Sequence, residues 1–280
     1  KIIKSGMNII DAGANIGLYS LIASKIVGQK GKVLSFEPSK ETFLRLLDNI
    51  KLNNSKNLIP LNIGLGDKIN QTLMLRQDIG CGDAERYLFP DNRMPKYKLK
   101  NINTTIREEK ILTNTIDNCL KSLKIQKIDF LKTDTEGFEY YILNGAKNML
   151  KNNPEIIIIM ECTELGNARA STTQKKVFKL LKYFELNIFY WNQKLNAWHD
   201  DKIGILKAGN IWACKNISQL QTLNSIMKKQ FNSYPIKTIA ILGVAGGNGL
   251  EHIDTSKIDK VYGIDINEDY LHTCKERYKN

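Results

Sequence analysis

The sequence predicts an α/β fold in which a doubly wound, mostly parallel sheet of seven strands ends in an antiparallel hairpin. Short apolar runs of strand length alternate along the chain with segments whose apolar residues recur every three or four positions, which is the helical period. Repeated β-α units of this kind build a parallel sheet with helices on both faces. The last two strand-like runs have no helix between them, and we expect that pair to be antiparallel.

The first three strands are predicted at residues 7–10, 32–36 and 58–65. Residues 17–27 predict the helix between the first two, with an apolar face that we expect to be buried: Leu18, Leu21, Ile22 and Ile26. The next helix begins at Ser39, a residue type that favours the N-cap position. We expect this helix, which reaches Leu52, to bury Phe43, Leu46, Leu47 and Ile50.

Residues 72–110 interrupt the alternation. A short strand at 72–76 is followed by polar, aromatic, glycine and proline residues without a regular period. So long an irregular stretch inside a compact domain is typical of a functional loop. We therefore expect residues 80–108 to form one wall of a ligand site, with four side chains available for contacts: Arg86, Tyr87, Arg93 and Tyr97.

The alternation then resumes to the end of a first domain, residues 1–215. Three helices are predicted at 115–122, 137–150 and 172–185, and four strands at 128–133, 155–160, 186–191 and 210–215. Residues 216–235 predict a linker helix. Residues 236–280 repeat the opening pattern of strand, glycine-rich loop and strand, and we interpret them as the truncated start of a second domain of the same class. Since the chain begins with Lys1, we expect a fragment of a longer protein.

Composition and charge set outer limits on function. There is no run of 18 apolar residues, so we expect no membrane span. The five cysteines have no CxxC pair or nearby histidine, which indicates free thiols in a reducing cytoplasm rather than a zinc site or disulfides. The net charge of +12 would attract polyanions. The lysines are spread along the chain, however, so a solvated basic surface is favoured and nucleic acid is not the expected partner. The sequence leaves the oligomeric state open.

The turn Asp11-Ala-Gly-Ala-Asn-Ile-Gly17 lies between the first strand and the first helix. Its glycines allow a sharp turn, and the amides of the helix N-terminus then face a ligand. Glu37, 24 residues after Gly13, follows the second strand, where an acid can bind ribose hydroxyls. NAD would fit this spacing too. The turn lacks the full G-x-G-x-x-G pattern, and the anionic Asp11 would repel a pyrophosphate but attract a sulfonium or amino group, which favours S-adenosylmethionine.

Three sequence blocks resemble the FkbM family of methyltransferases: the turn at 11–17, Glu37-Pro38, and Lys132-Thr-Asp-Thr-Glu-Gly-Phe-Glu139. The resemblance extends through Thr115-Ile-Asp117 and Asn144-Gly-Ala146 and covers about residues 1–215. It implies a Rossmann-like class I methyltransferase that uses S-adenosyl-L-methionine. It also implies transfer of the methyl group to a hydroxyl of a sugar, in a polysaccharide, glycolipid or secondary metabolite.

Carried over residue by residue, the resemblance assigns four residues to the methionine part of the cofactor: Asp11, Gly13, Ala14 and Asn15. Glu37 would bind the ribose, and Ser39 would flank the same pocket. Asp134 and Glu136 would lie at the end of the fourth strand, near the methyl group that is transferred.

Methyl transfer to a hydroxyl needs alignment and, in most cases, a base that takes the proton. Asp134 is the first candidate base and Glu136 the second. Lys132 shares a side of the strand with Asp134 and could orient the carboxylate or the acceptor. Glu161, at the end of the fifth strand, is a weaker candidate, and no metal is expected. The alternative for Glu136 and Asp134 is a structural one, in which they complement the dipole of the following helix.

Two other functions stay open at this point. A nucleic-acid methyltransferase is favoured by the charge, but the chain has no Asp/Asn-Pro-Pro-aromatic tetrad and no Pro-Cys pair for base methylation, so only ribose 2′-O transfer would remain. The third reading is a module that binds S-adenosylmethionine without turnover. The presence of Asp11, Glu37 and Asp134 together argues against that reading.

Overall fold

A computed structural model describes residues 2–79, 86–88, 105–192, 197–200, 209–220, 238–242 and 260–264. The chain divides into two compact units. The first unit runs from Ile2 to Leu220, and the second contains Gln221–Asn280 together with Lys1. Each unit is described by itself. Within the described residues, no helix is long and apolar enough to cross a membrane.

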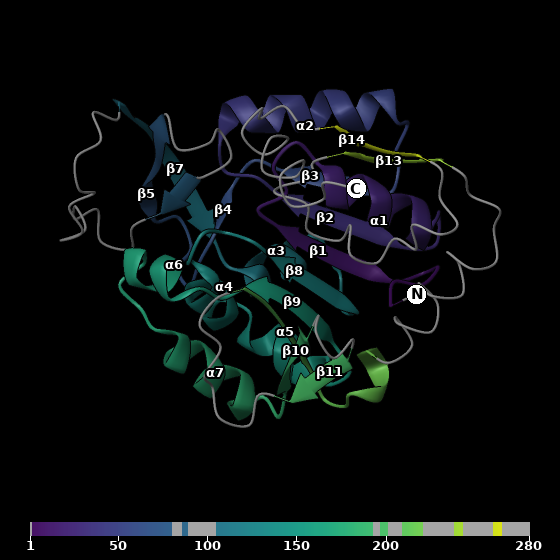
Figure 1. The fold of residues 1–280 in the computed structure, drawn as a ribbon. Coiled ribbons are helices and arrows are strands. Elements are labelled where there is room, and N and C mark those ends of the chain that lie inside the picture. Colours follow the sequence, from purple (N-terminus) through teal and green to yellow (C-terminus); the bar gives the residue numbers. More distant parts are fainter. Residues whose placement is uncertain are drawn as a thin grey trace. The chain divides into compact units, whose positions relative to one another are not determined.

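The main sheet of the first unit contains eight described strands in the order β11-β10-β12-β9-β8-β1-β2-β3 (Figure 1). The five strands β9, β8, β1, β2 and β3 run parallel to one another. Strand β12 runs antiparallel to both of its neighbours, β9 and β10. The strands of this sheet have the bounds β1 Asn8–Ala12, β2 Lys32–Phe36, β3 Leu58–Leu61, β8 Phe130–Thr133, β9 Ile157–Glu161, β10 Asn187–Asn192, β11 Ala197–Asp200 and β12 Asn210–Cys214. The mostly parallel α/β sheet and the antiparallel pairing of β10 with β12 are confirmed. The predicted number of seven strands is one too few, because β11 adds an edge strand antiparallel to β10.

Helices lie on both faces of this sheet, with α1 and α2 on one side and α4 and α7 on the other (Figure 1). The described helices are α1 Leu18–Val27, α2 Lys40–Leu52, α3 Ile116–Ser122, α4 Glu139–Asn144, α5 Lys147–Asn152, α6 Glu164–Arg169 and α7 Gln174–Tyr183. Threonine side chains cap α3, α6 and α7 by accepting a backbone N–H three residues on, as expected for N-caps.

Two predicted helices differ from the structure. The single helix expected at 137–150 is α4 and α5, separated at Gly145, whose carbonyl accepts from the Asp117 N–H (3.0 Å) instead of continuing a helical ladder. Helix α1 has the predicted extent but not the predicted buried face. Leu18 and Ile22 are 37% and 50% exposed, while the buried positions are small or short: Ser20, Ala23, Ser24 and Val27.

Helix α2 also differs in part from the predicted burial. Leu46 is buried, but Leu47 is exposed and Phe43 and Ile50 are only partly buried. Thr42 takes a buried place on this helix instead. The Thr42 hydroxyl accepts a hydrogen bond from Arg86, a residue of the second sheet.

The second sheet, in the order β4-β7-β5-β6, comes mostly from the segment that we expected to be largely irregular. Its strands are β4 Gly64–Leu65, β5 Thr72–Ile79, β6 Arg86–Leu88 and β7 Thr105–Asn114. Strand β4 is the end of the predicted third strand at 58–65, which the structure divides between the two sheets. Strands β5 and β7 form an antiparallel ladder from Thr72 to Ile79, and β6 pairs antiparallel with β5. Leu73, Leu75 and Ile111 join the main core. The described parts of this segment are therefore ordered sheet, while Arg93 and Tyr97 lie outside the described residues.

The core of the first unit is formed by the strands of the main sheet, with Ile10, Leu34, Leu131 and Ile158 fully buried. Cys119, Cys162 and Cys214, the cysteines that fall in the described segments, are buried free thiols. In the second unit, strands β13 Thr238–Leu242 and β14 Lys260–Ile264 pair in parallel. The predicted linker helix at 216–235 lies largely outside the described residues, and the assignment of 236–280 to a second domain stays a prediction.

Candidate active site

A cavity of about 320 Å³ opens at the carboxyl ends of β1, β2 and β8. This is the edge at which open α/β sheets bind ligands, and the volume is in the range of small-molecule sites. Seven of the nine predicted site residues line it: Gly13, Ala14, Asn15, Glu37, Lys132, Asp134 and Glu136. The other two, Asp11 and Ser39, are not part of its wall.

The turn after β1 forms one side of the cavity as a backbone cradle. Gly13 has a φ of 75°, and a Cβ at this position would lie 2.1 Å from the backbone oxygen of Asp134. Only glycine therefore allows the ends of β1 and β8 to approach so closely. The N–H groups of Gly13 and Ala14 both donate to the Phe36 carbonyl (3.0 and 2.9 Å), which ties the cradle to the end of β2.

Glu37 is a buried acid in the wall of the cavity, at the end of β2. Its Oε2 accepts from the Asn15 N–H (3.0 Å) and its Oε1 from the Ser39 N–H (2.9 Å). Burial raises the pKa of Glu37, while the two N–H donors and the charges of Arg86 and Lys132 oppose that rise. Ser39 thus acts on the cavity through its backbone, which orients Glu37 and starts α2.

Asp11 lies beneath the cavity in a chain of buried polar groups. The residue is 1% exposed. Its Oδ2 accepts from the Ser20 hydroxyl (2.6 Å), which in turn accepts from the Ser35 hydroxyl (2.6 Å). Its Oδ1 lies 3.1 Å from Lys132 Nζ. The carboxylate is therefore already neutralised by a cation on β8, and it acts on the site by holding Lys132.

Lys132 connects the cradle with the candidate base. Its Nζ donates to the Gly13 carbonyl (3.0 Å), lies 3.8 Å from Asp134 Oδ2 and sits 5.0 Å from the centre of the Tyr19 ring. Burial alone would lower the pKa of Lys132, but the carboxylates of Asp11 and Asp134 outweigh this effect and raise it. The side chain is accordingly a fixed cation under the mouth of the cavity.

Three carboxylates gather where β8 and β9 end. Asp134, Glu136 and Glu161 each place one oxygen within 4.8 Å of the others. The Asp134 side chain is 47% exposed, and Glu136 Oε2 lies 3.7 Å from Arg169 Nη1 on α6. The structure thus brings the two predicted bases and the weaker candidate Glu161 to one place, where they could accept a proton, bind hydroxyl donors or hold a cation with oxygen ligands.

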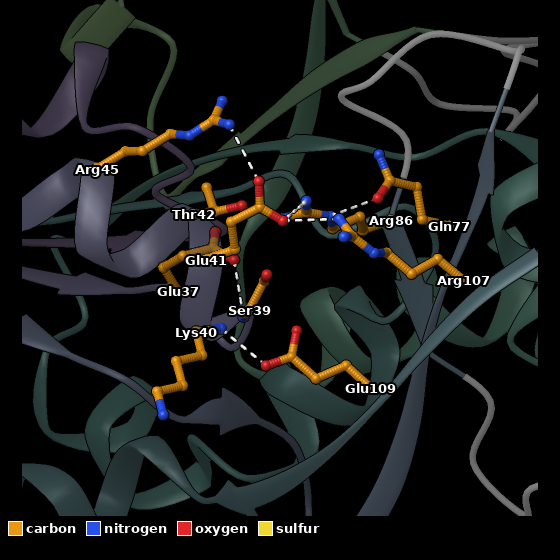
Figure 2. A network of polar contacts seen from close by, with 10 residues as sticks. All are labelled: Glu37, Ser39, Lys40, Glu41, Thr42, Arg45, Gln77, Arg86, Arg107 and Glu109. Carbon is orange, nitrogen blue, oxygen red and sulfur yellow. Dashed lines mark hydrogen bonds and ion pairs between the residues drawn. The ribbon is translucent and has the colours of Figure 1, made fainter.

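The second sheet supplies part of the cavity wall, and its strand β6 belongs to the segment 80–108 that the sequence predicted as one wall of a ligand site. Arg86, expected among ligand contacts of a loop, lines the cavity and donates to the hydroxyl of Thr42 on α2 (Figure 2). Its neighbour Tyr87 is buried under the Arg169 guanidinium, with 5.0 Å between Arg169 Cζ and the ring centre.

Tyr19, which the sequence analysis missed, also lines the cavity. Nothing in the sequence distinguishes it from a surface residue of α1, so only the fold could reveal it. The same holds for the apolar residues of the cavity wall that come from β5 and β6, Leu75 and Leu88.

A cavity at the switch of a doubly wound sheet, with a glycine cradle and a buried acid at the second strand end, defines a nucleoside-cofactor enzyme of the class I type. Residues 11–187 match the family model described as the methyltransferase FkbM domain. This is more than half of the chain, so the protein belongs to the FkbM methyltransferase family. It is an S-adenosylmethionine-dependent methyltransferase, as the sequence resemblance predicted.

Known proteins similar to this chain include a hexuronic acid methyltransferase, AglP, of Haloferax volcanii. It is 28% identical over 194 residues, which cover 69% of this chain and 68% of that protein. Among solved structures, an FkbM methyltransferase from Methylobacillus flagellatus KT is 16% identical with a TM-score of 0.43, over 75% of this chain and 44% of that one. Fibrillarin from Aeropyrum pernix, in complex with S-adenosyl-L-methionine, is 12% identical with a TM-score of 0.42, over 76% and 68% of the two chains.

Proposed function

We propose that this methyltransferase acts on a hydroxyl group of a sugar, free or within a glycan. The observation that carries the proposal is the position of Asp134, whose carboxylate is half exposed at the mouth of the cavity and 3.8 Å from the Lys132 ammonium. A general base must be exposed to the acceptor and held in place, and Asp134 meets both requirements. The relative that acts on hexuronic acid supports the choice of a sugar.

The residues of the cavity fit the cofactor that the family uses. Glu37 lines the cavity at the end of β2, and each of its carboxylate oxygens accepts one backbone N–H. A carboxylate at this strand end suits the vicinal hydroxyls of a ribose. The cradle Gly13–Asn15 offers backbone atoms and no bulky side chain to the methionine part. Asp11, in this proposal, contributes indirectly through Lys132 rather than by contact with the cofactor.

Bound S-adenosylmethionine supplies a methyl group on a positively charged sulfur. The carboxylate of Asp134 would accept the proton of the acceptor hydroxyl, so that the acceptor oxygen can take the methyl group while the carbon–sulfur bond breaks and neutral S-adenosylhomocysteine is left. Lys132, held by Asp11 and the Gly13 carbonyl, fixes the orientation of Asp134. Glu136 and Glu161 then accept hydrogen bonds from neighbouring hydroxyls of the acceptor, which fits a ligand rich in O–H donors. We also propose that the protein is cytoplasmic, as the sequence predicted.

A panel of acceptors tests the proposal. Transfer of a tritiated methyl group from S-adenosylmethionine should be measured with oligosaccharides that contain uronic acid, with neutral oligosaccharides and with RNA. We expect incorporation into at least one sugar class and none into RNA. Mass spectrometry should place the methyl group on a sugar oxygen.

Incorporation into RNA alone would contradict the proposal and would support ribose 2′-O transfer. Binding of S-adenosylhomocysteine without transfer to any acceptor of the panel or of a fractionated cell extract would support a module without turnover. The same panel with 1 mM EDTA, and with Mg²⁺ restored, would show whether the carboxylates Asp134, Glu136 and Glu161 work with a cation.

A further inference from the structure

Apolar side chains at the start of α1 are exposed to water although they belong to the cavity. Ile16, Leu18 and Tyr19 line the cavity, yet they are 42%, 37% and 61% exposed. Helix α1 buries mainly small side chains instead, so the core does not use these larger ones. Cavities that bind small molecules are lined by apolar and aromatic side chains, and exposed apolar surface at such a place is a mark of ligand contact.

The Tyr19 ring lies close to the candidate base. Lys132 Nζ lies over this ring, 5.0 Å from its centre, and the same Nζ lies 3.8 Å from Asp134 Oδ2. Lys132 is itself held by the Asp11 carboxylate (3.1 Å) and the Gly13 carbonyl (3.0 Å). The aromatic ring and the carboxylate are therefore both neighbours of one fixed ammonium group, and a single sugar unit can reach both.

The cavity wall combines two kinds of surface at this place. The three side chains from the start of α1 supply an apolar surface, and Asp134 and Glu136 supply oxygens that accept hydrogen bonds. A sugar ring has the same two kinds of surface, because its C–H bonds form apolar faces while its hydroxyls project around the rim. The face of an aromatic ring is electron-rich and attracts the weakly positive hydrogens of C–H bonds. A sugar can thus stack on Tyr19 and present a hydroxyl to Asp134 at the same time.

We propose that Tyr19 is an acceptor-binding residue, on whose exposed ring one sugar unit of the acceptor stacks while a hydroxyl of that unit meets Asp134. The inference rests on the proposed function and deepens it. It requires an acceptor that offers an apolar ring face beside the hydroxyl that is methylated. It also assigns part of the acceptor site to α1, in addition to the segment 80–108 that the sequence predicted for that purpose.

The other possible neighbour of the Tyr19 ring is the methionine part of the cofactor, since the cradle Gly13–Asn15 precedes α1 directly. The two neighbours are separated by what a loss of the ring changes. A contact with the acceptor affects the KM for the acceptor, whereas a contact with the cofactor affects the affinity for S-adenosylhomocysteine. Because 61% of Tyr19 is exposed, we expect the first effect.

Initial rates of methyl transfer test the inference, measured over a range of concentrations of the oligosaccharide in the panel that accepts methyl groups fastest. Tyr19→Ala should raise the KM for this oligosaccharide by about tenfold, the factor that one aromatic contact supplies. The kcat, the affinity for S-adenosylhomocysteine and the melting temperature should stay nearly unchanged, because a stacking contact acts equally on the bound acceptor and on the transition state. Tyr19→Phe keeps the ring and should restore the KM. The matched control is Tyr183→Ala, because Tyr183 is 77% exposed on α7 and lies outside the wall that the described residues form.

The remaining outcomes contradict the inference in distinguishable ways. An unchanged KM in Tyr19→Ala would overturn it and leave the proposed function intact, provided that the unmodified chain methylates the oligosaccharide. Weaker binding of S-adenosylhomocysteine with an unchanged KM would place the ring against the cofactor. If Tyr19→Phe behaves like Tyr19→Ala, the hydroxyl and not the ring makes the contact, and the inference is wrong. If the unmodified chain methylates no sugar of the panel, the proposed function fails, and this inference fails with it.

Discussion

Replacing Glu139 with glutamine should remove a pH dependence from the stability of the first unit. Glu139 is fully buried at the start of α4. Its Oε1 accepts from the N–H (2.9 Å) and the hydroxyl (2.8 Å) of Thr135, the residue after Asp134. Burial raises the pKa of Glu139 to about 7, against the opposing effect of these donors, and Glu161 adds to the rise. The folded chain therefore holds a proton on this group at a pH where the unfolded chain does not.

The size and sign of the effect follow from the two pKa values. The rise from 4.5 to about 7, at about 1.4 kcal/mol per unit, corresponds to about 3 kcal/mol. Below pH 4.5 the group is protonated in both states and its contribution to stability is fully present. As the pH rises the unfolded state releases the proton first, and this contribution is lost progressively until the folded group ionises near pH 7.

Urea unfolding followed by tryptophan fluorescence measures this loss directly. The free energy of unfolding should be determined at pH 4.5 and pH 8 for the unmodified chain, for Glu139→Gln and for Glu155→Gln, an exposed control. The decrease from the lower to the higher pH should be smaller by about 3 kcal/mol in Glu139→Gln than in the other two chains. Equal decreases in all three chains would refute the reasoning, because the burial of Glu139 would then carry no energetic consequence.

Three further predictions concern the cavity. Lys132→Met leaves the buried Asp11 carboxylate without its cation, so calorimetric or urea unfolding should show a loss of about 3–5 kcal/mol, and an unchanged stability would speak against the pairing. Gly13→Ala places a Cβ 2.1 Å from the Asp134 backbone oxygen at a φ of 75°. The substitution should weaken S-adenosylhomocysteine binding and lower the melting temperature. Unchanged binding would mean that the backbone of the turn can move to accept the methyl group. Glu37→Ala should weaken that binding by about 1.5–3 kcal/mol, whereas Asp48→Ala, an exposed substitution on α2, should not.

The central sheet could be predicted because its strands are short apolar runs whose order follows from β-α units. The glycine turn at 11–17 and the acid at Glu37 are likewise local signals, since each follows directly from the end of a strand. Strand β11 escaped prediction because Ala197–Asp200 is only four residues long and contains no apolar run beyond Ala-Trp. It pairs only with β10, at the edge of the described sheet, so its residues do not have to be apolar on both faces.

The failures within helices have a different cause. The apolar residues of α1 predicted a face that includes Leu18 and Ile22, but the helix turns Ser20 and Ser24 inward instead. Both hydroxyls donate to partners in other elements, the buried Asp11 carboxylate and the partly buried Asn57 side chain. Pattern reasoning counts a serine as a surface residue, and the partners that make its burial favourable lie in other elements.

The site was predictable only where its residues follow strand ends. Lys132, Asp134 and Glu136 belong to one short block at the carboxyl end of β8, so their proximity follows from the chain itself. Arg86 reaches the cavity through the second sheet and is held there by a hydrogen bond to Thr42, 44 residues earlier, so its place in the wall has no local signal. The sequence predicted that Asp11 contacts the cofactor, whereas in the structure Asp11 pairs with Lys132 on the neighbouring strand. A contact between two separate strands leaves no local pattern in the sequence.

The most direct test of the account concerns Asp134 and the chemical step. Single-turnover transfer of a tritiated methyl group from bound S-adenosylmethionine to the sugar acceptor should be compared in the unmodified chain and in Asp134→Asn, with S-adenosylhomocysteine affinity measured in parallel. If Asp134 is the base, the rate should fall by about 10²–10⁴-fold while affinity and melting temperature stay nearly unchanged. A fall of only a few-fold, together with weakened affinity, would contradict the account, since Asp134 would then hold the cofactor instead.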